Sequence, residues 1–319
     1  MQNGFFLTTW FLQAMKWVYG NVNSVFLTIF ICTVVLKLMT LVSDVKTRKS
    51  SMDMAALQPE IQKIQKKYPN DPQKAQQAQS KLMKERGVSM WGSCLPMLIT
   101  MPLFFCFLSA FRFWGYEETI RLLVEENPAQ ILESFKFLWI HNIWQPDSGL
   151  APVIMKAKDF LSIAKLDQLL YLKNNPGVWE KLVEMGLAAA NGLNADGTTA
   201  YVFLNTEAAQ AAYTAAVLPL MNLYSGYSNG WFILPLLSGA TNFLSSWLMQ
   251  RGQPKNPQTD STNKMMMWMF PIMSIWVCLT YNAAFALYWS ISSMCMIVIN
   301  LVLNKKYPRN LAPVEGDKK

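Results

Sequence analysis

Five long apolar runs divide the chain, and polar segments of very different lengths separate them. The first run covers residues 24–42, and Lys37 is its single charge. At about 1.5 Å of rise per residue, a helix of this length spans a hydrocarbon core of about 30 Å. The same pattern predicts transmembrane helices over residues 24–42, 92–113, 230–250, 265–281 and 283–304.

Lys37 needs a physical explanation, because a cation near the bilayer centre costs roughly 2.5–3.5 kcal/mol on insertion scales. One explanation is that its long side chain reaches the lipid headgroups. The other is that Lys37 faces water within the membrane and has a function there. The residues alone leave both explanations open.

Residues 1–23 combine apolar positions with Trp10 and Trp17 and carry little charge. This composition predicts an amphipathic helix in the membrane interface, and a buried helix of the fold is the alternative. The segment has no basic start and no small-residue cleavage site, so we expect no cleavable signal peptide.

The polar segment 43–91 predicts a helical hairpin in water. A heptad seam marks its first helix, and small residues mark one face of its second helix. Asp71 suits the cap between them, Pro72 the first position of the second helix, and Gly87 its end. The predicted contact residues are Met54, Leu57, Ile61, Ile64 and Tyr68 on one side and Ala75, Ala78 and Leu82 on the other.

The long segment 114–229 is too mixed in polarity to span a membrane. We predict helices over residues 129–137, 156–173, 178–190 and 207–224, with turns at Asn191-Gly192 and Asp196-Gly197. Its part 149–229 is predicted to form a helical insertion outside the membrane.

Charge predicts the orientation of the spans. Segment 43–91 carries ten basic residues against five acidic ones, loop 251–264 three against one, and tail 305–319 five against two. Segment 114–229 carries seven against twelve. By the positive-inside rule, the hairpin, the loop and the basic tail are cytoplasmic, and the N-terminus and the long segment lie outside.

The sequence contains no recognisable set of catalytic residues. His141 is the single histidine, and no Gly-Lys dipeptide of a Walker A loop occurs. We therefore expect no enzyme, no metal and no cofactor. The cysteines, Cys32, Cys94, Cys106, Cys278 and Cys295, all lie in apolar runs and are expected to be packed thiols.

Residues 57–102 closely resemble the signature of the YidC family of membrane-protein insertases, which have mitochondrial and chloroplast relatives. Thr33 to Lys37 also matches the family's T-x-x-x-R pattern in the first core span. The likeness covers residues 5–148 and 230–305. The matching positions are Leu57-Gln58-Pro59, Lys67-Tyr68, Asp71, Gly87-Val88, Cys94-Leu95-Pro96, Met101-Pro102, Leu138-Trp139-Ile140-His141, Ile233-Leu234-Pro235 and Leu287-Tyr288-Trp289.

Several positions depart from the family pattern. Lys37 replaces the family's arginine, which keeps the charge but loses the planar fork that binds a carboxylate. Val42 stands where the family usually has proline, and Ser93 and Thr100 replace the commoner glycine and glutamine. The insertion 149–229 has no counterpart in short members, and the sequence gives it no role.

The resemblance implies an all-α membrane protein in which five transmembrane helices surround a hydrophilic groove, open to the cytoplasm and to lipid. Lys37 takes the place of the groove's basic residue, and the resemblance favours its functional explanation. The other side chains expected to line the groove are Thr28, Thr33, Ser109, Asn242, Ser245 and Asn300. Taken alone, such residues equally suit hydrogen bonds between helices.

The resemblance also implies a function: insertion and folding of nascent membrane proteins in a bacterial plasma (inner) membrane, without nucleotide hydrolysis. The expected partners are the substrates, the lipid bilayer and the ribosome, and the hairpin and the tail 305–319 are expected to bind the ribosome. The Sec translocon is a further candidate partner, and DNA is not expected to bind. The alternative is a small transporter or channel with Lys37 as an anion site, although we find no internal repeat. A pure assembly chaperone is a third option.

Overall fold

The computed structural model describes residues 6–69, 71–87, 95–163, 169–194, 197–250 and 257–306. It divides into two compact units. Unit 1 comprises residues 1–32, 105–238 and 274–289, and unit 2 comprises residues 33–104, 239–273 and 290–319. Several long helices therefore contribute residues to both units.

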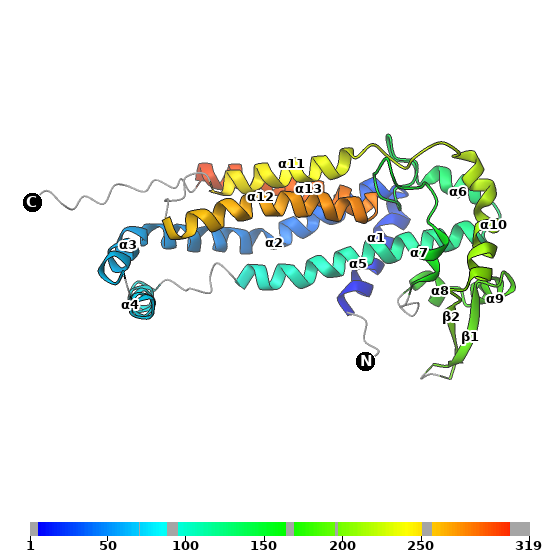
Figure 1. Cartoon of the computed structure of the whole chain (residues 1–319), viewed down its shortest axis with the longest axis horizontal. Coiled ribbons are helices and arrows are strands. Elements are labelled where there is room, and N and C mark those ends of the chain that lie inside the picture. Colours follow the sequence, from blue (N-terminus) through cyan, green and yellow to red (C-terminus); the bar gives the residue numbers. More distant parts are fainter. Residues whose placement is uncertain are drawn as a thin grey trace, which may run out of the picture. The chain divides into compact units, whose positions relative to one another are not determined.

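Most of the described chain is helical (Figure 1). The longer helices are α1 (Phe6–Val22), α2 (Val25–Ala56), α5 (Leu95–Val124), α10 (Glu207–Leu223), α11 (Ile233–Gln250), α12 (Pro257–Thr280) and α13 (Ala283–Lys306). The shorter ones are α3 (Gln58–Lys67), α4 (Pro72–Glu85), α6 (Pro128–Ser134), α7 (Ala157–Leu161), α8 (Leu170–Asn174) and α9 (Gly177–Glu184).

Each predicted span overlaps one helix, namely α2, α5, α11, α12 or α13. Residues 230–232 of the third span are not helical, and residues 92–94 of the second lie outside the described part. Among the described residues, Val25–Lys46 and Ala283–Lys305 are long and apolar enough to cross a membrane, and Lys264–Thr280 is a shorter apolar helix. The mostly helical architecture with apolar spans agrees with the prediction. That all five helices cross a membrane around a groove stays a prediction.

Aromatic side chains form much of the core of unit 1. Phe111, Trp114 and Phe285 are almost fully buried. The ring of Tyr288 on α13 stacks on Phe107 of α5, with centroids 5.0 Å apart. Between α12 and α13, Asn282 accepts a hydrogen bond from the backbone N–H of Phe285 and donates one to the carbonyl of Phe111. The helix break predicted at Tyr281-Asn282 is therefore present, and the Asn282 side chain links the start of α13 to α5.

The insertion 149–229 differs from the helical prediction. Its strands β1 (Ala188–Leu193) and β2 (Thr199–Phe203) form an antiparallel pair, in which Ala189 faces Val202. The predicted helix 178–190 ends early: Gly186 takes a φ of 71° after α9, and the N–H groups of Gly186 and Leu187 bond back to the carbonyls of Val183 and Leu182. This glycine cap terminates the helix.

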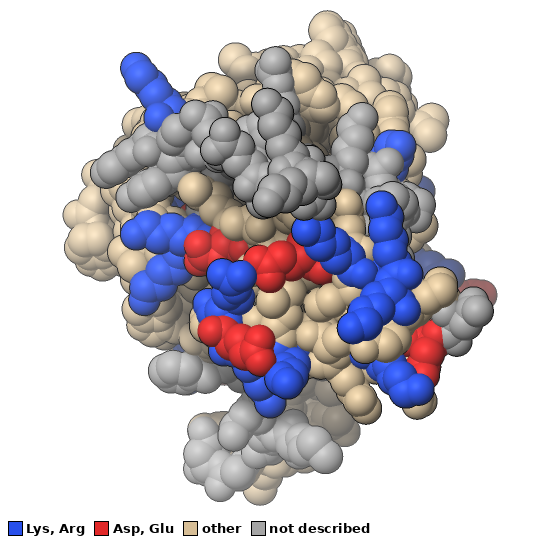
Figure 2. Space-filling model, turned by 90° about the vertical axis from the view of Figure 1, so that its left-hand side faces the viewer, with Lys and Arg blue, Asp and Glu red and all other residues tan. Residues whose placement is uncertain are grey.

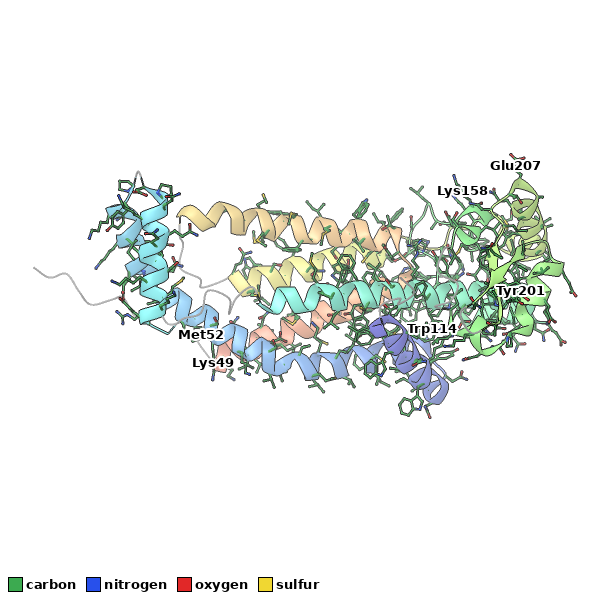
Figure 3. All side chains as sticks on the ribbon, turned by 90° about the horizontal axis from the view of Figure 1, so that it is seen from below. Lys49, Met52, Trp114, Lys158, Tyr201 and Glu207 are labelled. Atoms are coloured by element: carbon green, nitrogen blue, oxygen red, sulfur yellow. The ribbon has the colours of Figure 1, made fainter. Side chains whose placement is uncertain are left out.

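Two further predictions for the insertion are corrected. Residues 162–163 and 169 are not helical, so the predicted helix 156–173 consists of the two short helices α7 and α8, with residues 164–168 outside the described part. Asn191-Gly192 belongs to β1 rather than to a turn, and the pairing is irregular between Ala190 and Leu193. Tyr201 of β2, labelled in Figure 3, stacks its ring on Trp179 of α9 with centroids 4.9 Å apart.

In unit 2, α2 continues well beyond the predicted span and reaches Ala56 before the hairpin of α3 and α4 begins. Lys49 and Met52 lie near its end (Figure 3). The hairpin has a small core of Leu57, Ile61 and Met83, with Leu82 packed against it. Asp71 caps α4, as predicted, by accepting a hydrogen bond of 3.0 Å from the N–H of Lys74. Met54, also predicted on this seam, has a side chain outside the described part.

Candidate functional site

A polar strip runs along α2 within unit 2. Thr33 and Lys37 are four residues apart and therefore lie on one face of the helix. Thr33 is buried and Lys37 is half-buried. Other positions of the same helix expose large apolar side chains: Leu38, Met39 and Val42 are 63%, 71% and 64% exposed. One helix thus presents a partly buried cation on one side and a surface suited to lipid on another.

Asp44 extends this strip, and the sequence analysis missed it. It follows Lys37 by seven residues, about two helical turns, so both side chains project from the same face. Asp44 is half-buried and interacts electrostatically with Lys37. The signal was present in the sequence, because an acid seven residues after an intramembrane lysine is a helical spacing.

The other predicted groove residues fall in both units. Asn242 and Ser245 on α11 and Asn300 on α13 belong to unit 2, like Thr33 and Lys37. Asn300 is only 5% exposed. Thr28 and Ser109 belong to unit 1, where Thr28 is buried and donates its hydroxyl proton to the carbonyl of Ser24 at 2.8 Å. For Thr28 the helix hydrogen bond is observed, and a role in a groove stays a prediction.

The surface of the hairpin in unit 2 is rich in basic side chains. Figure 2 shows Lys and Arg over the face that carries α3 and α4, with Asp and Glu between them. Arg86 after α4 pairs with Glu60 of α3 at 2.8 Å, which closes the end of the hairpin. A cavity of about 820 Å³ is lined by hairpin residues, including Gln62, Tyr68 and Gln79. Surfaces of this sign attract phosphate-rich partners.

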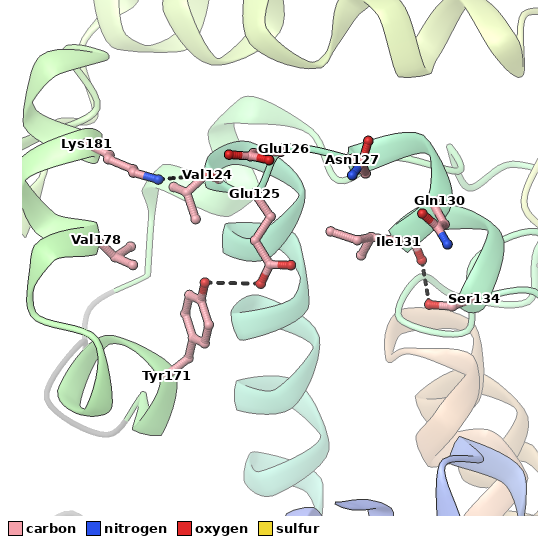
Figure 4. Close-up of a pocket in the computed structure, with 10 residues that line it drawn as sticks. All are labelled: Val124, Glu125, Glu126, Asn127, Gln130, Ile131, Ser134, Tyr171, Val178 and Lys181. Atoms are coloured by element: carbon pink, nitrogen blue, oxygen red, sulfur yellow. Dashed lines mark hydrogen bonds between the residues drawn. The ribbon is translucent and has the colours of Figure 1, made fainter.

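A second cavity, of about 580 Å³, lies in unit 1 among α5, α6, α8 and α9 (Figure 4). Glu125 accepts a hydrogen bond of 3.2 Å from the hydroxyl of Tyr171 and pairs with Arg121 at 2.7 Å. Lys181 donates to the backbone carbonyl of Val124. Burial and the nearby Glu125 carboxylate raise the pKa of Tyr171 to about 12, so its phenol stays protonated and donates. Glu125 and Lys181, two charged groups of the lining, therefore both have polar partners.

Glu117 is a buried acid of unit 1 that the sequence analysis also missed. Its side chain is fully buried, forms an ion pair with Lys16 of α1, and accepts a hydrogen bond of 3.0 Å from the backbone N–H of Tyr171. Burial raises the pKa of Glu117, whereas Lys16 and the Tyr171 N–H lower it. Helix α1 is therefore tied to the rest of unit 1 by a buried ion pair.

Other sequence predictions concern single side chains. The ring of His141 lies near the rings of Tyr224 and Tyr227, with centroids 5.3 and 5.5 Å away. Cys32, Cys106, Cys278 and Cys295 are free thiols, of which Cys106 and Cys278 are buried and the other two half-buried, and Cys94 lies outside the described part. Within the residues that the structure describes, no group of acids, histidines and cysteines could hold a metal ion.

Comparison with known proteins adds family information. The family model described as 60 kDa inner membrane protein matches residues 17–185 and 198–310. A membrane protein insertase YidC of Clostridium perfringens is 36% identical over 146 residues, which is 46% of this chain and 55% of the relative. The YidC of Clostridium tetani is 37% identical over 123 residues, which is 39% of this chain and 49% of the relative. The YidC of Chlorobium limicola is 33% identical over 139 residues, which is 44% of this chain and 21% of the relative. The matched part thus spans about half the length of the two clostridial relatives.

Proposed function

The chain belongs to the 60 kDa inner membrane protein family, the YidC family, and from this premise we propose that it inserts nascent membrane proteins into a bacterial membrane. The observation that carries the proposal is the strip of Thr33 and Lys37 on α2, a helix whose other positions expose Leu38, Met39 and Val42. A helix with these two surfaces suits a polar path that is open to lipid.

The proposed mechanism uses the charge of Lys37 and needs no nucleotide. The short polar end of a substrate enters a hydrophilic groove lined by Lys37, Thr28, Thr33, Ser109, Asn242, Ser245 and Asn300. A cation about 4 Å from a substrate carboxylate contributes about 4 kcal/mol at an effective dielectric constant of 20, and less in a well-hydrated groove. This attraction offsets part of the desolvation cost. Transfer of the substrate's apolar helix into lipid then drives insertion.

The proposed orientation places the N-terminus and residues 114–229 outside, and the hairpin, loop 251–264 and tail 305–319 in the cytoplasm. The basic hairpin surface supports the ribosome as a partner, because ribosomal RNA is rich in phosphate. A cysteine introduced at Ala78 should be shielded from an impermeant thiol reagent in intact cells, and one at exposed Asn194 should react. Labelling at Ala78 without lysis contradicts this orientation.

The direct test uses the purified chain in liposomes. We expect it to increase the protease-protected fraction of a single-span substrate without any translocon or nucleotide, and to leave the flux of small solutes unchanged. Solute flux without insertion would instead indicate the transporter or channel. Insertion that occurs only when a Sec translocon is added would indicate an assembly chaperone.

A further inference from the structure

Asp44 is an acid in the first apolar helix with incomplete hydrogen bonding. Its Oδ2 atom is buried and accepts no hydrogen bond in the part of the chain that the structure describes. A buried carboxylate oxygen without donors is costly unless a positive charge lies near it. Lys37 projects from the same face two turns earlier and interacts with Asp44 electrostatically. The two side chains are therefore complementary charges along one strip of α2.

Helix α13 supplies a second group without a partner. In unit 2, α13 runs in the same direction as α2 (Figure 1), and its Cys295 lies near enough to Lys37 for the two groups to influence each other. Asn300 follows Cys295 by five residues, about 7.5 Å along the helix, and Asp44 follows Lys37 by about 10.5 Å. The Nδ2 group of Asn300 is buried and donates no hydrogen bond within the described residues. The buried donor Asn300 Nδ2 thus lies farther along α13 than Cys295, and the buried acceptor Asp44 Oδ2 lies farther along α2 than Lys37, by similar distances.

We propose that Asp44 is the internal counter-charge of Lys37 and determines which charges the site accepts in a translocated segment. This inference rests on the proposed function and concerns its specificity. An acidic substrate side chain is attracted by Lys37 but repelled by Asp44, so it has to compete with Asp44 for the lysine. A basic side chain is attracted by Asp44 and repelled by Lys37. Asn300 of α13 adds a buried donor in the same unit, so Asp44 and Asn300 together offer an acceptor and a donor to the N–H and C=O groups of an extended segment. The site is dipolar rather than purely cationic.

The test compares substrates that differ only in the charge of their translocated tail. Full-length protein in liposomes receives single-span substrates whose tails carry Asp, Asn or Lys at the same positions, and the protease-protected fraction is measured. Asp44→Asn keeps the size of the side chain and removes its charge. We expect it to raise the ratio of acidic-tail to basic-tail insertion about threefold to tenfold, as expected for one charge about 10 Å away in a partly hydrated site.

Matched variants distinguish charge from packing. Asp44→Glu keeps the charge and should keep the wild-type ratio, whereas the double variant Lys37→Met, Asp44→Asn should show no preference between acidic and basic tails. Should Asp44→Asn fail to fold alone, the double variant still tests the counter-charge, because it removes both charges together and leaves no unpaired lysine. A uniform change for all tails in Asp44→Asn, or a tail preference in the double variant, overturns the inference. Failure of the wild type to insert any substrate overturns the proposed function, and the inference with it.

Discussion

Lys16 of α1 and Tyr171 of α8 meet at the same buried carboxylate, that of Glu117 on α5. Lys16 contributes its ammonium group and Tyr171 its backbone N–H. One side chain therefore joins the predicted interfacial helix to the insertion 149–229 within unit 1. The insertion is consequently more than an appendage, because it supplies one of the groups that stabilise a buried charge.

The first prediction concerns removal of residues 149–229 in favour of a short Gly-Ser linker. Insertase activity should persist, because the groove residues lie outside the deleted segment. Stability in detergent should fall, because Glu117 loses the N–H of Tyr171 and a buried charge with fewer hydrogen bonds costs about 1–3 kcal/mol. Adding Glu117→Gln should recover part of the lost melting temperature. Complete loss of activity in a stably expressed deletion would place the insertion in the core mechanism.

The second prediction concerns pH and the cavity of Figure 4. Arg121 holds the pKa of Glu125 below its usual range. The folded state therefore binds the proton less readily than the unfolded chain, and the pair contributes stability above the unfolded pKa that is lost as pH falls through the folded pKa. Melting curves of wild type and Glu125→Gln should differ at pH 7 and converge in acid. A difference that persists unchanged in acid would mean that the carboxylate charge is not responsible.

The third prediction concerns the hairpin. Ile61 is 5% exposed in the small core with Leu57 and Met83. Ile61→Ala removes buried apolar surface and leaves a cavity, which typically costs about 2–5 kcal/mol. Cleavage between residues 51 and 87 in limited proteolysis should become faster. Lys63→Ala, an exposed position on the same helix, is the matched control and should leave the cleavage rate unchanged. Equal cleavage of both variants would show that this core does not stabilise the hairpin.

The fourth prediction concerns the charge of Lys37. Lys37→Arg should retain activity, because arginine stays charged and adds a bidentate grip on carboxylates. Lys37→Met removes a cation from the apolar helix, so it should fold at least as well as wild type. It should nevertheless insert acidic-tailed substrates less efficiently, and replacing the tail acids by Asn or Gln should partly restore insertion. Equal insertion by wild type and Lys37→Met for all tails would instead support the explanation in which the lysine side chain only reaches the lipid headgroups.

The sequence predicted those elements whose signals are local. The break between α12 and α13 at Tyr281-Asn282 and the Asp71 cap of α4 both depend on residues next to the helix ends, and both are present. The strand Ala188–Leu193 was missed because its alanines favour helix locally, and pairing with residues 199–203 overrides that preference. Gly186 was the local signal for the end of α9.

The candidate site was predictable in part for the same reason. Lys37 was conspicuous as a single charge in an apolar run. Asp44 lies just past the end of that run, among polar residues, so its relation to Lys37 emerges only when α2 continues unbroken through it. Glu117 and Tyr171 are 54 residues apart in the chain, and no local pattern predicts that they meet.

Val42, where the family usually has proline, has a mechanical consequence. Helix α2 contains no proline between Lys37 and Ala56, so it has no built-in kink and acts as a stiff rod in unit 2. The distance between these two residues is about 28 Å along the axis. A tilt of about 5° imposed on this part of α2 at the hairpin therefore shifts the helix at Lys37 by about 2.5 Å. A ligand that tilts α2 when it binds the hairpin therefore also moves the charge of Lys37.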